Sequence, residues 1–93
     1  SILYVEIYGK TLTFHLKDNK ILELTKTLSE IIKLLPKDDF IQCHRSFLVA
    51  LNEIESITRY QILLSGGMKI PVSKLRYTDV QKALIESAAE KNI

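Results

Sequence analysis

Short runs of alternating apolar and polar residues, separated by only a few polar ones, constrain this chain more than any other feature. Residues 2–8 place Leu3, Val5 and Ile7 on one side, and residues 11–16 repeat the pattern. Successive side chains of a β-strand point to opposite faces of a sheet, so both runs predict strands. Such short connections favour antiparallel neighbours, because parallel strands need a long crossover.

Turn-forming residues divide the rest of the chain into further strands. Gly9 and Lys10 form a tight hairpin connection, since glycine readily adopts the positive φ that such turns need. A polar turn over residues 17–20 leads into a short strand over residues 21–24. Further strands are predicted over residues 40–49, 57–64 and 68–72, the last two joined by Ser-Gly-Gly at residues 65–67.

Two segments follow a helical period instead. Thr27 and Glu30 have the spacing of a capping box ahead of a short helix that Pro36 ends, and Thr78 and Gln81 repeat that spacing ahead of a C-terminal helix. The apolar residues expected to face inward are Leu28, Ile31, Ile32 and Leu35 in the first helix, and Val80, Leu84, Ile85 and Ala88 in the second. The predicted fold class is mainly β and antiparallel, with one short central helix and a C-terminal helix.

The length of 93 residues suits one domain over residues 1–93 with a modest core. The chain opens within a predicted strand and without an initiator Met, so we expect a fragment of a longer protein. No apolar stretch reaches the ~20 residues that a membrane-spanning helix needs. A single cysteine, Cys43, rules out an internal disulfide and agrees with a cytoplasmic location.

The residues that could support catalysis do not form a catalytic pattern. His44 and Ser46 would share one face of a strand, about 6–7 Å apart at the backbone. No G-x-S-x-G turn surrounds the serine, and no acid is placed to orient the histidine. His15 and His44 lack further ligands at metal-site spacing, and residues 65–67 lack a P-loop signature. We therefore predict no enzymatic activity, no metal and no cofactor.

The distribution of charge says more than the net charge of +2. Between residues 59 and 82 the single acid Asp79 stands against five cations, which are Arg59, Lys69, Lys74, Arg76 and Lys82. Neither a helix-turn-helix nor an aromatic RNA-binding sheet surface is predicted. Cations instead fall in turns and strand ends, among them Lys10, Arg45 and Lys74. If these meet at one edge, they could read guanine edges or pair with phosphate.

Two segments carry a family resemblance. FIQCHRSFLVALNEIESI over residues 40–57 and GGMKIPVSKLRY over residues 66–77 resemble the LytTR-type DNA-binding domain, the output module of LytR/AlgR-type bacterial response regulators. ILYVEIYGKTLTFHL over residues 2–16 is similar to the first hairpin of that family. The matching positions are Phe40, His44, Arg45, Ser46, Phe47, Leu48, Val49, Ile54, Ile57, Ile70, Pro71, Val72, Ser73 and Lys74.

The resemblance implies an elongated, mostly antiparallel β fold that binds double-stranded DNA through loops inserted into successive major grooves of promoter repeats. It assigns base contacts to Lys10, Arg45 and Lys74, with Arg45 displayed from a strand end. The residues assigned to phosphate contacts by neighbourhood are Ser46, Arg59, Ser73 and Arg76. It also implies an upstream receiver domain in the full-length protein and allows a homodimer on DNA.

Some expectations remain open within this resemblance. His44 is expected to bond to backbone and shape its loop rather than touch DNA. Ala50 stands where the family commonly has Asn, and Gln42 where it often has Arg or Lys. The backbone bond of that Asn and the phosphate contact of that cation are therefore not carried over to this chain. The alternative function is a protein-interaction or dimerisation module that meets an acidic partner through a basic edge. Salt separates the two, since binding to DNA by several cations weakens steeply as salt rises.

Overall fold

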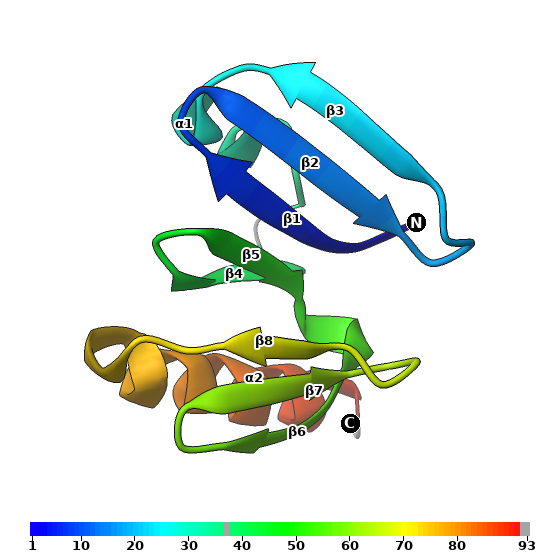
Figure 1. The fold of residues 1–93 in the computed structure, drawn as a ribbon. Coiled ribbons are helices and arrows are strands. Elements are labelled where there is room, and N and C mark those ends of the chain that lie inside the picture. The colour runs from blue at the N-terminus through cyan, green and yellow to red at the C-terminus, as the bar shows by residue number, and fades with distance from the viewer. Residues whose placement is uncertain (37, 92–93) are drawn as a thin grey trace.

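The computed structural model describes residues 1–36 and 38–91, which form two antiparallel sheets and two α-helices (Figure 1). The larger sheet has the order β3-β2-β1-β5-β4, and the smaller has the order β6-β7-β8. The strands are β1 (Ile2–Tyr8), β2 (Thr11–Leu16), β3 (Ile21–Thr25), β4 (Phe40–His44), β5 (Phe47–Ala50), β6 (Ile54–Thr58), β7 (Gln61–Leu64) and β8 (Lys69–Pro71). The predicted fold class is confirmed, and the molecule measures 36 × 27 × 26 Å.

Short helices link these strands. Helix α1 (Leu28–Ile32) follows β3, and helix α2 (Tyr77–Lys91) closes the described chain. Two 3₁₀ turns, η1 (Leu51–Glu53) and η2 (Lys74–Arg76), lead from β5 into β6 and from β8 towards α2. None of the helices in the described part is long and apolar enough to cross a membrane.

The central strands β1 and β5 of the larger sheet contribute to two apolar clusters, one on each face of the sheet. On one face α1 packs over Val5, Leu12, Phe14 and Leu48 through the buried Ile31. On the other face lies the second cluster, which the smaller sheet and α2 complete and whose buried members are Tyr4, Cys43, Val49, Ile62, Leu64, Ile70, Val72 and Val80. The central strands therefore join the two layers of the molecule.

The start of strand β1 pairs irregularly with β2. The register shifts between Ile2 and Tyr4, as at a β-bulge. Leu3, which alternation places with Val5 and Ile7, packs instead against the cluster that contains Tyr4. This prediction was wrong because a bulge shifts the pairing beyond it by one residue, and such a shift moves side chains to the other face.

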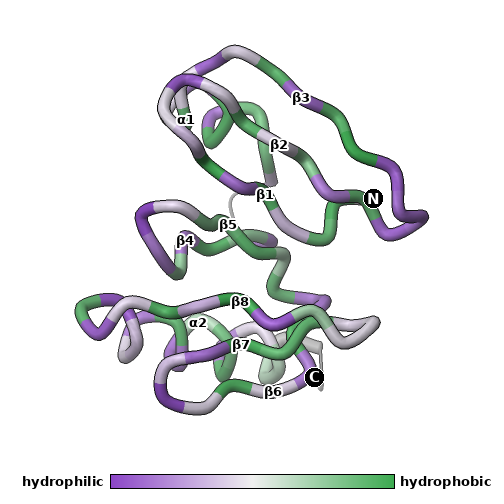
Figure 2. The backbone as a smooth tube through the Cα atoms, in the orientation of Figure 1, coloured by the Kyte–Doolittle hydropathy of each residue, from purple (hydrophilic) through white to green (hydrophobic). Residues whose placement is uncertain are grey.

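Two of the predicted strands were each too long. The strand expected over residues 40–49 is a hairpin of β4 and β5 with a turn at Arg45–Ser46, and the strand expected over 57–64 breaks at Arg59–Tyr60 between β6 and β7. Figure 2 shows the first of these turns as a hydrophilic segment between two more hydrophobic strands. Neither turn contains Gly, Pro or Asn, so the usual signal of a turn was missing.

Both predicted helices are present, but some of the side chains predicted to face inward are exposed. Thr27 caps α1 by accepting a hydrogen bond from the Glu30 amide at 3.3 Å, as predicted. Ile32, however, is 47% exposed, because α1 has only five residues and turns a single residue fully inward. In α2 the inward stripe follows residues 77, 80, 84 and 87, which leaves Ile85 69% exposed and Ala88 exposed. Thr78 lies within α2 and not ahead of it, because η2 runs directly into the helix.

Candidate nucleic-acid interface

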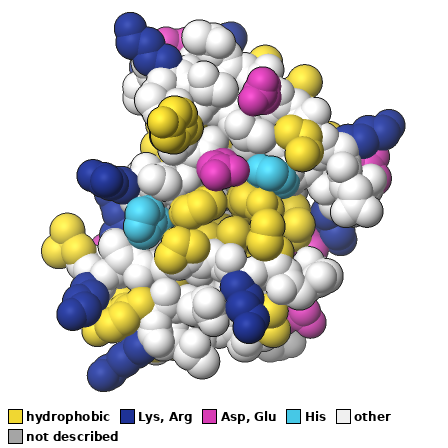
Figure 3. All heavy atoms as spheres, in the orientation of Figure 1, with side chains coloured by type: hydrophobic (Ala, Val, Ile, Leu, Met, Phe, Trp, Pro, Cys, Tyr) yellow, Lys and Arg dark blue, Asp and Glu magenta, His cyan; other side chains and the backbone are white. Residues whose placement is uncertain are grey.

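Four connections between elements lie along one side of the molecule, at the left in Figure 1. They are the β1–β2 turn at residues 9–10, the β4–β5 turn at residues 45–46, the β6–β7 turn at residues 59–60 and the segment 73–76 around η2. We call this surface the cationic rim. Every residue that the sequence proposed for DNA contact lies on it, and Figure 3 shows Lys and Arg side chains along the same edge.

The first turn owes its shape to a glycine. Gly9 has a φ of 58°, and Lys10 is not among the residues with positive φ. Positive φ at the first central residue alone is the pattern of a type II′ turn, whose twist matches that of the paired strands. Tyr8 pairs with Thr11 across the turn, so Lys10 stands exposed at its tip.

The β4–β5 turn is fixed by hydrogen bonds to its backbone. The Ser46 amide donates to Nδ1 of His44 at 3.0 Å, and the Ile7 amide of β1 donates to the Ser46 carbonyl at 2.8 Å. The first bond resembles an Asx-turn, in which a side chain accepts from the amide two residues on. The predicted role of His44, a ring bonded to backbone that shapes the loop, is confirmed. Arg45 is thereby exposed at the tip of a held turn and not at a strand end.

Backbone hydrogen bonds position the rim segments that belong to the smaller sheet and to η2. The Ser73 amide donates to the Cys43 carbonyl at 2.9 Å, and the Val72 amide donates to the Tyr60 carbonyl at 2.9 Å. The β6–β7 turn, the start of η2 and the end of β4 are therefore connected through main chain. The Val72–Tyr60 bond lies within the smaller sheet, whereas the Ser73–Cys43 bond links the smaller layer to β4 of the larger sheet and so fixes the two layers relative to one another at the rim.

Cys43 lies beneath this junction. Its side chain is fully buried, and its Sγ lies 3.5 Å from the Pro71 carbonyl, to which the thiol can donate. Burial raises the pKa of the Cys43 thiol to about 11, although hydrogen bonding and the positive charge of Arg76 act in the opposite direction. The thiol is therefore protonated near neutral pH and packs as a small apolar group.

Tyr60 holds the Lys74 side chain, a relation that the sequence did not predict. The Lys74 ammonium lies 5.8 Å from the centroid of the Tyr60 ring, and that ring meets the ring of Tyr77 edge-on at 5.5 Å. A cation over an exposed aromatic ring gains about 0.5–1 kcal/mol. Lys74 must give up this small gain to reach a ligand. No sequence signal marked Tyr60, because it fell inside a predicted strand.

The cations of the rim have no acidic partners within the described residues. The ion pairs among the described residues join Lys17 to Glu53 at 3.2 Å, Lys20 to Asp18 at 3.8 Å and His15 to Glu6 at 3.3 Å. None of them involves a rim residue. Of the seven predicted contact residues, the exposed ones are Lys10, Arg45, Arg59 and Lys74, and the partly exposed ones are Ser46, Ser73 and Arg76.

Ser73 differs from the other proposed contacts. Its Oγ is buried and has no hydrogen-bond partner within the described residues. A contact between this hydroxyl and a phosphate therefore requires rotation of the side chain. Such rotation would also give the hydroxyl a hydrogen-bond partner, and a buried donor without a partner is costly in free energy.

The two departures from the family pattern occupy positions on the β4–β5 hairpin. Ala50 is buried and pairs with Phe40, where a small apolar side chain fits. Gln42 is half-buried and pairs with Leu48, so its position would bring a long cation only partly to the surface. Neither residue lies at the tip of the turn that carries Arg45.

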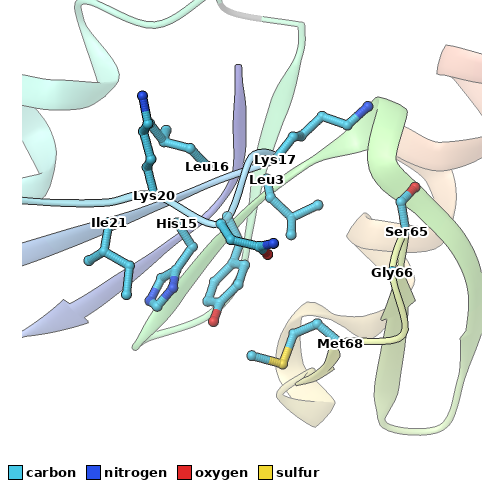
Figure 4. A pocket seen from close by; sticks show the side chains of 11 residues that line it. Leu3, His15, Leu16, Lys17, Lys20, Ile21, Ser65, Gly66 and Met68 are labelled. Carbon is cyan, nitrogen blue, oxygen red and sulfur yellow. The ribbon is translucent and has the colours of Figure 1, made fainter.

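A pocket of about 420 Å³ lies away from the rim, between the larger sheet and the β7–β8 turn (Figure 4). The rings of Tyr4 and His15 stack at a centroid distance of 4.2 Å within its lining, and Met68 faces them across the space. The ammonium groups of Lys17 and Lys20 point away from the pocket. Among the described residues no group of three His, Cys, Asp or Glu is placed to hold a metal ion.

Comparisons with known proteins agree with this arrangement. The sequence profile described as the LytTr DNA-binding domain matches residues 1–85. The sensory transduction protein LytT of Bacillus subtilis is 38% identical over 66 residues, which are 66% of this chain and 27% of that protein. LytT of Enterococcus faecalis is 36% identical over 62 residues, 61% of this chain and 26% of that protein. The chain thus spans little more than a quarter of the relatives it matches.

A solved structure gives the same answer for the fold. It is described as the LytTr DNA-binding domain of a methyl-accepting/DNA response regulator from Bacillus cereus. The TM-score is 0.77 at 32% identity, over 89% of this chain and 80% of that one. The arrangement of two sheets described above is therefore found in that domain as well.

Proposed function

Because this chain belongs to the LytTr DNA-binding domain family, we propose that residues 1–93 form one domain that binds double-stranded DNA sequence-specifically in a bacterial transcription regulator. The role is one of binding and not of catalysis, and it needs no cofactor. The full-length protein would work in the cytoplasm and carry an upstream receiver domain. Two copies would meet on paired promoter repeats as a homodimer.

The residues take two kinds of role in this proposal. Lys10, Arg45 and Lys74 enter major grooves, where a cation can donate to O6 and N7 of guanine. Phosphate contacts then fix the register without reading sequence. The residues proposed for these contacts are Ser46, Arg59, Ser73 and Arg76.

One observation carries the proposal: within the described residues the cations of the rim have no acidic partners, and a main-chain bond from Ser73 to Cys43 holds the two layers together there. Charges without acidic partners remain available to phosphate, whereas paired ones do not. Successive major grooves on one side of B-DNA are ~34 Å apart, and the turns of the rim come from both sheets. A rim that crosses both layers therefore suits a duplex lying along it.

The test begins with selection of duplexes from a random library by the unmodified protein. Affinity for the enriched sequence and for a scrambled one is then measured for the unmodified protein, for Arg45→Ala and for Lys20→Ala. Lys20 is an exposed lysine at the other edge and serves as the matched control. We expect Arg45→Ala to lose roughly 5- to 150-fold of discrimination, the worth of a good base contact, and Lys20→Ala to keep it.

The same measurements decide between DNA and an acidic protein partner. Failure of the unmodified protein to enrich any sequence, or a log affinity that hardly changes with log salt, would favour the interaction module. Retained discrimination in Arg45→Ala would show that the arginine is not a reader. A steep log-linear loss with salt, with the enriched duplex still bound better than the scrambled one, supports the proposed function.

A further inference from the structure

Of the two most exposed large apolar side chains among those described, one lies in the cationic rim and the other directly precedes it in the chain. Leu75 is 89% exposed and Tyr8 is 84% exposed, whereas the other exposed large hydrophobic residues range from 38% to 72%. Leu75 directly follows Lys74, and Tyr8 stands two residues before Lys10. The same combination, a lysine beside a bare apolar side chain, thus occurs in both layers of the molecule.

Leu75 contributes almost nothing to the fold. A single exposed leucine is ordinary on a protein surface, but such a residue usually covers a neighbour with part of its surface. Leu75 covers little, since it lies in the middle of η2 between two cations, Lys74 and Arg76. Flanking charges disfavour burial against an apolar protein surface and favour a polyanion that also offers apolar groups.

The backbone that carries Leu75 is held in place. The Ser73 amide bonds to the Cys43 carbonyl at 2.9 Å, and the Arg76 amide bonds back to the Ser73 carbonyl at 3.1 Å. Leu75 is therefore presented from a fixed turn beside a lysine. Lys74 and Leu75 are consecutive residues, about 3.8 Å apart at Cα, so both side chains start from the same short turn.

We propose that Leu75 reads the methyl group of a thymine in the major groove, next to the base that Lys74 contacts. The inference rests on the proposed DNA-binding function and extends it to a residue outside the predicted contact set. Thymine alone carries a C5-methyl group in that groove, and apolar side chains recognise it by contact. The lysine and the leucine together would then select a guanine beside a thymine.

The test uses the duplex that the unmodified protein enriches from a random library. Each thymine is replaced in turn by deoxyuridine, which lacks only the methyl group, and affinity is measured for the unmodified protein, Leu75→Ala and Ile85→Ala. Ile85, an exposed isoleucine on α2, is the control for loss of an apolar surface residue. Thermal melts check that both variants fold.

We expect one thymine in each repeat at which deoxyuridine weakens the unmodified protein by about fourfold, the worth of burying one methyl group. Leu75→Ala should bind the thymine duplex more weakly by a similar factor and ignore the replacement, while Ile85→Ala behaves as the unmodified protein does. Equal sensitivity of the Leu75→Ala and unmodified proteins to deoxyuridine overturns the inference, as does insensitivity of the unmodified protein at every position. Either result leaves the proposed function standing, whereas failure to enrich any sequence removes both.

Discussion

The cationic rim and the edge opposite to it differ in how they use the same kind of residue. The opposite edge consists of the β2–β3 turn and the β7–β8 turn, at the right in Figure 1. Its lysines, Lys17 and Lys20, pair with Glu53 and Asp18. The cations of the rim have no such partners in the described chain. Both edges carry cations, so a count of charges does not distinguish them. The structure does, because the lysines of the opposite edge form ion pairs and the cations of the rim form none within the described residues.

The two edges also differ in how the layers are joined. At the rim, a main-chain bond connects Ser73 of the smaller layer to Cys43 in β4 of the larger sheet. At the opposite edge the pocket of about 420 Å³ opens between the layers, and the connection includes the side-chain pair of Lys17 and Glu53. Main-chain bonds place groups more exactly than a mobile lysine can. Reading a base sequence requires such placement, and the predictions below test whether it matters.

The largest difference between the edges should come from removing two cations at each. Arg45→Ala/Lys74→Ala should weaken binding to the enriched duplex roughly thirtyfold or more, because two base contacts of about 1–3 kcal/mol each are lost. Affinity of Lys17→Ala/Lys20→Ala should stay within about twofold of the unmodified protein, since both lysines lie outside the rim and pair with acids. Fluorescence anisotropy measures both, with melts to confirm folding. Comparable losses for the two variants would erase the distinction between the edges.

The next effect concerns the turn that carries Arg45. His44→Ala removes the acceptor for the Ser46 amide, so affinity should fall about 2- to 12-fold, the net worth of one hydrogen bond. His44→Asn should recover most of this loss, because an asparagine side chain can accept from the amide two residues on. Titrations with the enriched duplex measure both variants. If Asn fails to rescue, the ring itself and not its hydrogen bond is what binding requires.

A smaller effect should appear in the salt dependence. Arg59→Ala and Arg76→Ala should each reduce the slope of log affinity against log salt by about 0.9, the value for one lost phosphate contact. Discrimination between the enriched and scrambled duplexes should persist, since phosphate contacts carry no sequence information. Lys20→Ala supplies the unchanged reference slope. An unchanged slope in both arginine variants would remove these residues from the interface.

The smallest effect concerns the folding stability contributed by Cys43, in the core beneath the rim, and should be measurable only at alkaline pH. The folded-state pKa of Cys43 is raised to about 11 from an ordinary value of 9.0. Between those two values the unfolded chain has released the thiol proton and the folded chain has kept it, so stability falls as pH rises through this range. Chemical denaturation from pH 8 to 11 should show this decline, and Cys43→Ala should make it shallower. An equal decline in both proteins would mean that other groups cause it.

Much of the fold followed from the sequence because its signals are local. Alternation located β1 and β2, Gly9 located their turn, and Thr27 marked the start of α1. The breaks at 45–46 and 59–60 were missed, since contacts distant in sequence stabilise both turns and the local bond from Ser46 to His44 is made by residue types that do not by themselves predict a turn. The bonds from Ile7 to Ser46 and from Val72 to Tyr60 are such distant contacts. A single sequence contains no local mark of such contacts.

The family resemblance proposed the members of the site, and the geometry of these residues came only from the structure. Motif resemblance assigned contact roles to Arg45 and Lys74, and their shared surface became visible only once the sheets were placed together. The relation between Lys74 and Tyr60 and the exposure of Leu75 depend on how η2 packs, so neither could be derived from spacing. Ser73 illustrates the same limit, since its neighbourhood suggested a contact while packing buries its hydroxyl.

The central claim is that cations from both layers contact one duplex together. An NMR titration of the isotope-labelled chain with the enriched duplex tests it most directly, because amide signals report contact residue by residue. The account predicts concerted shifts at residues 9–10, 45–46, 59–60 and 73–76, with little change at 17–20 and 65–68. Shifts confined to the turns of one layer, or strongest at the opposite edge, would contradict it.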